Sequence, residues 1–176
     1  MSKSFKLTKN LYLKEASLKD NDFIFKLRTN KKLSRFINPT SINKKDQIIW
    51  FKKYLLRRKN KKEFYFIFQL NKKNIGFARI IHLKKDTFHF GGWILDKNTK
   101  PWISLESCLA IYEYAFNILL YKDCLLWINL NNIKVIKFHK SLGSTYVKKT
   151  NKEIFLKFTK KKYYKLKEKF NYFYYY

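Results

Sequence analysis

Cysteine, acidic side chains and long apolar runs are all scarce in this 176-residue sequence. The two cysteines, Cys108 and Cys124, lie within apolar stretches, which argues against a disulfide scaffold and favours a reducing, cytoplasmic setting. No run of about 18 apolar residues is present, so no membrane span is expected. The start, MSKSFKLTKNLYLKEA, carries charges every few positions and is not expected to be a secretory signal.

Acidic residues are few, because 12 Asp and Glu stand against 40 Lys and Arg, for a formal net charge of +28. Such an excess is typical of proteins that neutralise nucleic-acid phosphates. Only five of the basic residues are arginine, however, and the lysines accompany abundant Asn, Ile, Phe and Tyr along the whole chain, as AT-rich codons would produce. Specific nucleic-acid binding is therefore not expected. The charge still favours anionic ligands, including phosphorylated cofactors and sugars.

Histidine is also rare, and one of the three lies in an unexpected place. The stretch NIKVIKFHKSLGS puts Val135, Phe138 and Leu142 at helical spacing, and His139 falls in the same apolar stripe. No histidines, cysteines or carboxylates recur at metal-ligand spacing, and neither cysteine has a histidine partner nearby in sequence. We therefore expect neither a metal site nor a cysteine nucleophile.

Apolar periodicity and turn residues predict one mixed sheet with helices on both faces. The expected elements, in chain order, are a strand over 11–16, helices capped by Ser17 and Asn43, the strands EFYFIFQL, NIGFARIIHL and FHFGGWIL, a helix over SLESCLAIYEYAFNILL, the strand CLLWINL, the helix that contains His139, and a hairpin of STYVKK and EIFLKFTK. Short polar connections between the three central strands indicate an antiparallel meander. The predicted fold class is therefore α/β (α+β), in the order β-α-α-β-β-β-α-β-α-β-β.

The C-terminal residues do not obviously belong to this plan. We predict a domain over residues 1–160 and a basic, aromatic tail over 161–176. Fraying of at least the last six residues is the expectation. The alternatives are a last helix laid on the domain and a partner-binding segment, because so many exposed aromatic side chains would form an adhesive patch.

Three stretches of the sequence are distinctive: Gly92-Trp93-Ile94-Leu95, YEYAF at residues 112–116, and the segment from Asn132 to Gly143. Through these stretches, residues 11–159 resemble the GNAT superfamily of acyl-coenzyme A N-acyltransferases. These stretches are similar to the family's "GYWI" strand, its helix ending near "YAF", and its later "N…LYEKLGF" helix. The spacing between them also matches. The resemblance implies a GNAT-like fold whose fourth and fifth strands splay apart.

The resemblance also implies that acetyl-CoA is the acyl donor. Its pantetheine arm would pair with the backbone of Trp93, Ile94 and Leu95, and Asn132 would contribute from the later helix. The pyrophosphate would bind main-chain amides at the start of the following helix; the residues implied there are Lys100, Trp102, Ile103 and Ser104. The family usually has glycines in this loop, whereas this chain has none and has a proline that lacks an N–H.

His139 stands where many family members have a tyrosine that protonates the departing thiolate. The resemblance therefore implies that His139 is the catalytic acid, and an imidazolium with a pKa near 6.5 could protonate a thiolate near 8.5. The alternative is an ordinary helix histidine, half-buried and hydrogen-bonded. His82 and His89 are candidates for the general base, although a structural role is the more ordinary interpretation of each, and water alone could serve.

The acceptor is indicated by three weaker motifs, LRTN, DQIIWF and IGFARI. They are similar to a GNAT subgroup that acetylates amino groups of nucleotide-linked deoxysugars, which implies Arg28, Asn30, Trp50 and Arg79 near the acceptor pocket. Alternatively, Trp50 is a core residue and Arg79 a structural ion-pair partner. The expected partner is a small-molecule amine, in a monomer or homodimer. Two other functions stay open: N-terminal acetylation of proteins such as ribosomal proteins, and a non-catalytic domain that binds RNA or a partner.

Overall fold

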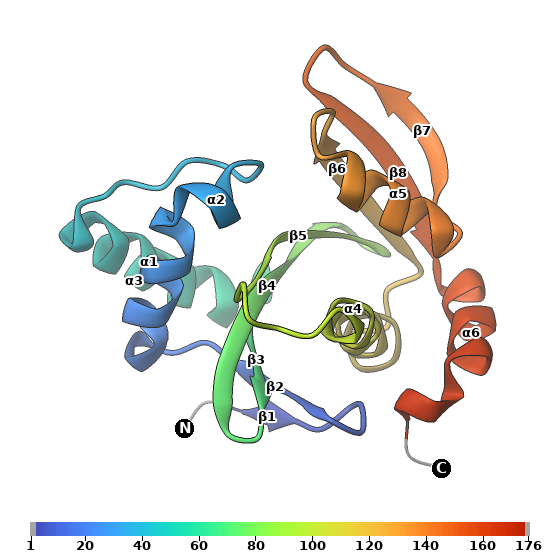
Figure 1. Cartoon of the computed structure of the whole chain (residues 1–176), viewed down its shortest axis with the longest axis horizontal. Helices are drawn as coiled ribbons and strands as arrows, with labels where there is room; N and C mark the ends of the chain where they lie inside the picture. Colours follow the sequence, from blue (N-terminus) through green and yellow to red (C-terminus); the bar gives the residue numbers. More distant parts are fainter. Residues whose placement is uncertain (1–2, 175–176) are drawn as a thin grey trace.

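The computed structural model describes residues 3–174 and contains an eight-stranded sheet with helices on both faces (Figure 1). The strand order is β1-β2-β3-β4-β5-β6-β8-β7. The strands are β1 (Ser4–Phe5), β2 (Leu11–Glu15), β3 (Glu63–Leu70), β4 (Lys73–Lys84), β5 (Thr87–Leu95), β6 (Asp123–Asn129), β7 (Thr145–Lys149) and β8 (Glu153–Thr159). The α-helices are α1 (Asn21–Thr29), α2 (Lys31–Ser34), α3 (Lys44–Lys59), α4 (Trp102–Glu113), α5 (Ile133–Ser141) and α6 (Lys160–Lys169).

The predicted fold class and order of elements are confirmed, with β1, α2 and α6 added to them. Local signals explain several boundaries. The Asp20 carboxylate accepts a 2.9 Å hydrogen bond from the Ser17 N–H in the capping box before α1, and the Asn43 side chain caps α3. Asn71 and Lys72, both at positive φ, form the tight turn between β3 and β4.

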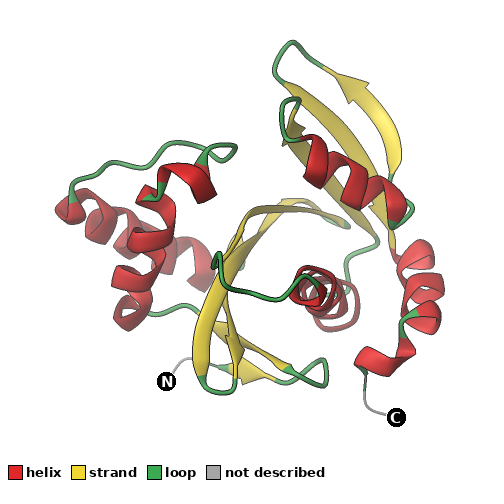
Figure 2. Ribbon diagram, viewed as in Figure 1, coloured by secondary structure: helices red, strands yellow, loops and turns green. Residues whose placement is uncertain are grey.

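Two apolar clusters cover the two faces of the sheet. Figure 2 shows the helices that lie on these two faces. The larger one contains α4, which lies in the concavity of the curved sheet and contributes five buried residues, from Cys108 to Tyr112. The smaller one packs α1 and α3 against the opposite face of β3 and β4, with Phe51 and Tyr54 fully buried. Both faces of β3 are therefore covered, which explains why EFYFIFQL is a continuous apolar run and does not alternate.

The strands β5 and β6 diverge, as the family resemblance implied. They are parallel and pair only over Thr87–His89 and Asp123–Leu125, so the rest of β5 has no partner strand on that side. A bulge follows in β5, where Gly92 and Trp93 stand opposite Ala78 alone, and Gly92 has a φ of +56°. The bulge redirects Trp93 at the point where the gap between the two strands opens.

The expectation that the last six residues fray was wrong for residues 171–174; the remaining two lie outside the described residues. Helix α6 packs on the domain through Tyr163, whose hydroxyl donates to the Glu113 carboxylate of α4, and Lys167 pairs with the same carboxylate at 2.9 Å. Phe173 and Tyr174 are buried in the larger cluster, 6% and 3% exposed. The aromatic side chains of the tail therefore complete the core that the sheet and α4 leave open.

Candidate active site

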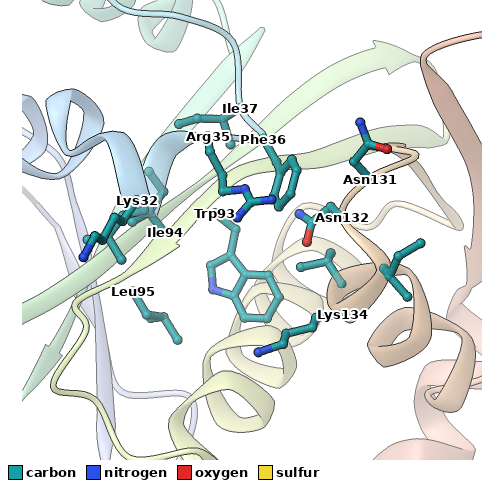
Figure 3. A pocket seen from close by; sticks show the side chains of 13 residues that line it. Lys32, Arg35, Phe36, Ile37, Trp93, Ile94, Leu95, Asn131, Asn132 and Lys134 are labelled. Carbon is teal, nitrogen blue, oxygen red and sulfur yellow. The ribbon is translucent and has the colours of Figure 1, made fainter.

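A groove of about 440 Å³ lies beside the diverging strands. One wall comes from the end of β5, with Trp93, Ile94 and Leu95, and another from the start of α5, with Asn132 and Lys134. Figure 3 shows the Trp93 side chain at the centre of the groove, with Arg35 and Phe36 on one side and Lys134 on the other. Four predicted cofactor-binding residues, Trp93, Ile94, Leu95 and Asn132, thus lie together.

The groove continues into a narrow cavity of about 80 Å³ between β5 and β6, and His139 lines it. The His139 ring makes edge-on contacts with Phe90, Trp93 and Phe138 at centroid distances of 5.9, 6.0 and 5.3 Å. Its Nδ1 atom and the Nε1 atom of Trp93 are buried without a hydrogen-bond partner. Buried polar groups without a partner are rare and costly, so two of them beside an open strand edge are features expected of a ligand site.

His139 differs in charge from the expectation. The ring is 2% exposed, and burial among aromatic side chains lowers its pKa from 6.5 to about 3. The resting side chain is therefore a neutral imidazole at neutral pH, not the imidazolium that the motif comparison assumed. The reason is tertiary, because Phe90 and Trp93 reach the ring from β5, far away in sequence.

The predicted pyrophosphate residues Lys100, Trp102, Ile103 and Ser104 lie at the start of α4 but line none of the cavities described here. The N–H groups of Ile103 and Ser104 already donate to carbonyls three residues earlier, at 3.0 and 3.2 Å. Trp102 stacks on Phe173 of the tail at 6.4 Å. The preceding loop is tied by Asp96, whose side chain and carbonyl accept from the following residues. Pyrophosphate binding by these residues stays a prediction.

A further cavity, of about 200 Å³, adjoins the narrow cavity between β5 and β6 and shares Gly91, Gly92 and Trp127 with it. Arg28 from α1 and Arg79 from β4, two of the residues predicted near the acceptor, line this cavity. We name it the acceptor cavity after that prediction, and contact of either arginine with an acceptor stays a prediction. Arg28 also donates to the Thr40 hydroxyl and the Asn38 carbonyl, at 2.5 and 3.1 Å, and so holds the segment before α3.

Arg79 also has the structural role that was its alternative interpretation. Its guanidinium lies 2.6 Å from the carboxylate of Glu63, which is 2% exposed and also pairs with Arg57 at 2.5 Å. Trp50 lies among the guanidinium groups of Arg28, Arg57 and Arg79, at 5.9, 5.4 and 5.5 Å from its ring.

Two of the predicted acceptor residues do not line the cavities. Trp50 packs against the smaller core cluster and stacks on Tyr54 at 6.1 Å. Asn30 caps α2, with its side-chain oxygen accepting from the N–H groups of Lys32 and Leu33 at 3.0 and 3.2 Å. Their contact with an acceptor stays a prediction, whereas their packing and capping roles are present in the structure.

His89 lines the acceptor cavity with its ring stacked on Trp127, at a centroid distance of 3.3 Å. Nδ1 lies 3.0 Å from the Leu125 carbonyl, and burial lowers the pKa of His89 to about 3. Nδ1 therefore carries the proton and donates to the carbonyl, which leaves Nε2 as an acceptor. A Cβ at Gly91 would lie 2.1 Å from Nε2, so the glycine makes room for the ring.

Sequence reasoning missed several residues that line these cavities: Arg35, Phe36, Ile37, Asn129 and Glu153. The first three belong to the segment after α2, which has no periodic pattern. Asn129 and Glu153 stand opposite each other in the β6–β8 register, and only strand pairing brings them together.

Comparison with known proteins identifies the family. The family model described as acetyltransferase (GNAT) domain matches residues 10–145, most of the chain. The protein therefore belongs to the GNAT acetyltransferase family, and the splayed β5 and β6 are that family's arrangement. No curated protein sequence matches the chain.

Solved structures give nearer comparisons. The chain is similar to apo FdhC, described as a nucleotide-linked sugar GNAT, with 29% identity and a TM-score of 0.87, over 96% of this chain and 98% of that one. It is also similar to a spermidine N-acetyltransferase from Vibrio cholerae in complex with CoA and spermine. The latter is 17% identical, with a TM-score of 0.71 over 88% of this chain and 98% of that one, and shows the shared fold.

Within residues 3–174, no group of three or more His, Cys, Asp or Glu side chains could hold a metal ion. No helix in this range is long and apolar enough to cross a membrane.

Proposed function

We propose that the protein transfers an acetyl group from acetyl-CoA to the primary amine of a nucleotide-linked deoxysugar. The observation that carries the proposal is the pair of adjoining cavities at the divergence of β5 and β6. One cavity is aromatic and bordered by unpaired main chain, and the other is lined by Arg28 and Arg79. A thioester donor and an anionic amine acceptor suit these two environments.

The donor side has the groups that a pantetheine arm would need. The edge of β5 beyond His89 has no partner strand, and Trp93 Nε1 is a buried donor without an acceptor. The amides of pantetheine can satisfy both kinds of group. Lys134 and Arg35 border the same groove and would favour the negative charge of coenzyme A. Trp93, Ile94, Leu95 and Asn132 are therefore the residues that we assign to the donor.

Acetyl-CoA would supply the reactive thioester, and the protein must deliver a proton to the sulfur that leaves. We assign this delivery to His139, which lines the cavity between the strands. Because burial keeps the ring neutral, one ring nitrogen carries a proton and the other does not. The ring can give its N–H proton to the thiolate and take up, on the other nitrogen, the proton that the attacking amine loses.

The acceptor is inferred from charge and from the comparison with FdhC, which is similar over nearly the full length of both chains. A nucleotide sugar carries a diphosphate, and Arg28 and Arg79 line the cavity. A polyamine would meet the same two cations in a protein of net charge +28, which makes it the less favourable ligand. Basic peptides, the substrates of the N-terminal acetylation alternative, face the same repulsion.

The experiment is an acetyl-transfer assay in which the release of the free coenzyme A thiol is measured. The amines to be compared are a nucleoside diphosphate 4-amino-4,6-dideoxyhexose, the methyl glycoside of the same sugar, spermidine and a lysine-containing peptide. We expect turnover of the sugar nucleotide, with kcat/KM at least about tenfold above the methyl glycoside, because the diphosphate contacts arginine. Preference for spermidine or peptide would overturn the acceptor assignment. Absence of acetyl-CoA binding in calorimetry would favour the non-catalytic alternative.

A further inference from the structure

Glu153 has an unusual environment for a carboxylate in this protein. The chain has 40 basic and 12 acidic side chains, and almost every acid in residues 3–174 has a hydrogen-bond or ion-pair partner. Within that range the side chains of only Glu153 and Glu168 have none. Glu168 is exposed on α6, whereas Glu153 is half-buried and lines the acceptor cavity.

The position of Glu153 is fixed by main-chain contacts. It is the first residue of β8, and its N–H donates to the Thr150 hydroxyl at 3.0 Å, while its carbonyl accepts from the Thr150 N–H at 2.8 Å. In the β6–β8 pairing it stands opposite Asn129, which lines the same cavity. Its side chain therefore extends from a rigid strand end, although it pairs with no side chain of the protein.

The two sides of the acceptor cavity carry side chains of different kinds. Arg28 and Arg79 are its cationic residues, contributed by α1 and β4 on one side of the strand gap. The other side of the cavity and β5 contribute groups that accept hydrogen bonds. These are the Glu153 carboxylate, the Asn129 side chain and the unprotonated Nε2 of His89. Neither guanidinium lies within 4 Å of the Glu153 carboxylate, so the two charges are not neutralised by each other. A ligand with an anionic part and an ammonium group matches this arrangement.

We infer that Glu153 is an acceptor-positioning residue, which binds the ammonium form of the amine and aims it toward the strand gap. This inference rests on the proposed function for the identity of the acceptor. A carboxylate beside an ammonium stabilises the protonated amine, so Glu153 serves binding and not deprotonation. Its removal should raise the amine KM and, because the bound amine then loses its proton more easily, move the rise of kcat to lower pH.

The charged or titratable side chains that line the cavity around the bound amine are Arg28 of α1, Arg79 of β4, His89 of β5 and Glu153 of β8. Burial keeps His89 neutral throughout the pH range of an assay, and the arginines stay charged. Within this set, a change in the pH profile between wild type and a Glu153 variant therefore reports on the amine.

The test compares Glu153→Gln with Glu168→Gln, which makes the same change of charge at the other unpaired carboxylate. Kinetics are measured with the sugar nucleotide and with spermidine, at several pH values. We expect Glu153→Gln to raise the amine KM about tenfold or more, with the acetyl-CoA KM unchanged and kcat rising at lower pH. Glu168→Gln should match the wild type. An unchanged acetyl-CoA KM also shows that the variant is folded.

The outcomes separate this inference from the proposed function. If the wild type acetylates spermidine and not the sugar nucleotide, the proposed acceptor is wrong, and Glu153 is judged with spermidine. If Glu153→Gln behaves like Glu168→Gln with whichever amine reacts, the role of Glu153 is wrong and the proposed function stands. If the wild type acetylates neither amine, both are rejected.

Discussion

The proposed donor groove and the proposed acceptor cavity meet at the gap between β5 and β6, yet their linings differ. The inner end of the donor side, between the two strands, presents main chain and aromatic rings, and its buried polar atoms without partners are nitrogens of Trp93 and His139. Charged side chains, Arg35 and Lys134, border only its outer groove. The acceptor side presents charged side chains, with Arg79 held by the buried Glu63. A donor shared by a whole family can be bound by backbone geometry, whereas a particular acceptor requires particular side chains.

The two buried histidines show the same contrast. Burial lowers the pKa of each to about 3, so both are neutral. His89 stacks on Trp127 and has its Nδ1 bonded to Leu125, which fixes the ring, whereas Nδ1 of His139 has no partner. His89, which is fixed and has Nε2 as a hydrogen-bond acceptor, suits binding of the amine. His139, whose Nδ1 has no hydrogen-bond partner, suits transfer of a proton.

Replacement of His139 by alanine should have the largest effect on the donor side. We expect kcat to fall about 100-fold or more, with the amine KM within about twofold of wild type, because proton delivery acts on the chemical step. Steady-state kinetics at saturating acetyl-CoA measure both values. Glu168→Gln, at an exposed position of α6 that lines none of these cavities, is the control. If kcat/KM fell about 100-fold because the amine KM rose while kcat stayed unchanged, the assignment of His139 would be contradicted.

Glu63→Gln should remove the ion pairs that hold Arg79 in the acceptor cavity and leave the donor groove unchanged. Loss of the buried charge leaves Arg57 and Arg79 without their partner, and we expect the free energy of unfolding to fall by about 2 kcal/mol. Urea denaturation measures the change. Asp123→Asn, in the more exposed pair with Lys157, should cost less than about 0.5 kcal/mol. Acetyl-CoA affinity should be equal in both variants; a selective loss in Glu63→Gln would show that the two sides are coupled.

Gly91→Ala should displace the His89 ring, because the new Cβ would lie 2.1 Å from Nε2. We expect the amine KM to rise about tenfold, or about 1.4 kcal/mol, with the acetyl-CoA KM much less affected. The double variant with His89→Ala separates the causes. If the ring mediates the effect, adding Gly91→Ala to His89→Ala should change little, whereas additive losses would point to the backbone of β5.

The acid side of the stability profile should report both histidines. A histidine whose folded pKa lies near 3 and whose unfolded pKa is about 6.5 contributes stability that is complete above pH 6.5 and is lost as the pH falls toward 3. Within that window the slope approaches about 1.4 kcal/mol per pH unit for each ring. His139→Gln or His89→Gln should reduce the slope in urea denaturation at pH 4.5–6.5, and a slope equal to that of the wild type in both variants would contradict the lowered pKa values.

Much of the fold could be predicted because its signals are local. Helical spacing located α4 and α5, turn residues located the β3–β4–β5 meander, and Ser17 with Asp20 marked the helix start before α1. Trp93, Ile94, Leu95 and Asn132, which the motifs assign to the donor, line one groove, and their contact with a donor stays a prediction. The acceptor side was harder, since Trp50 and Asn30 pack and cap, while Glu153 and Asn129 carried no signal of their own.

The sequence by itself determined the order of elements, the glycine pair that bends β5 and the large excess of positive charge, because periodicity, backbone freedom and charge are properties of neighbouring residues. The tertiary structure decided that His139 is neutral, that Glu153 faces a cavity beside Asn129, and that Phe173 and Tyr174 close the core. Burial and strand register depend on segments that meet only after folding, and no local pattern encodes which surface will cover a side chain.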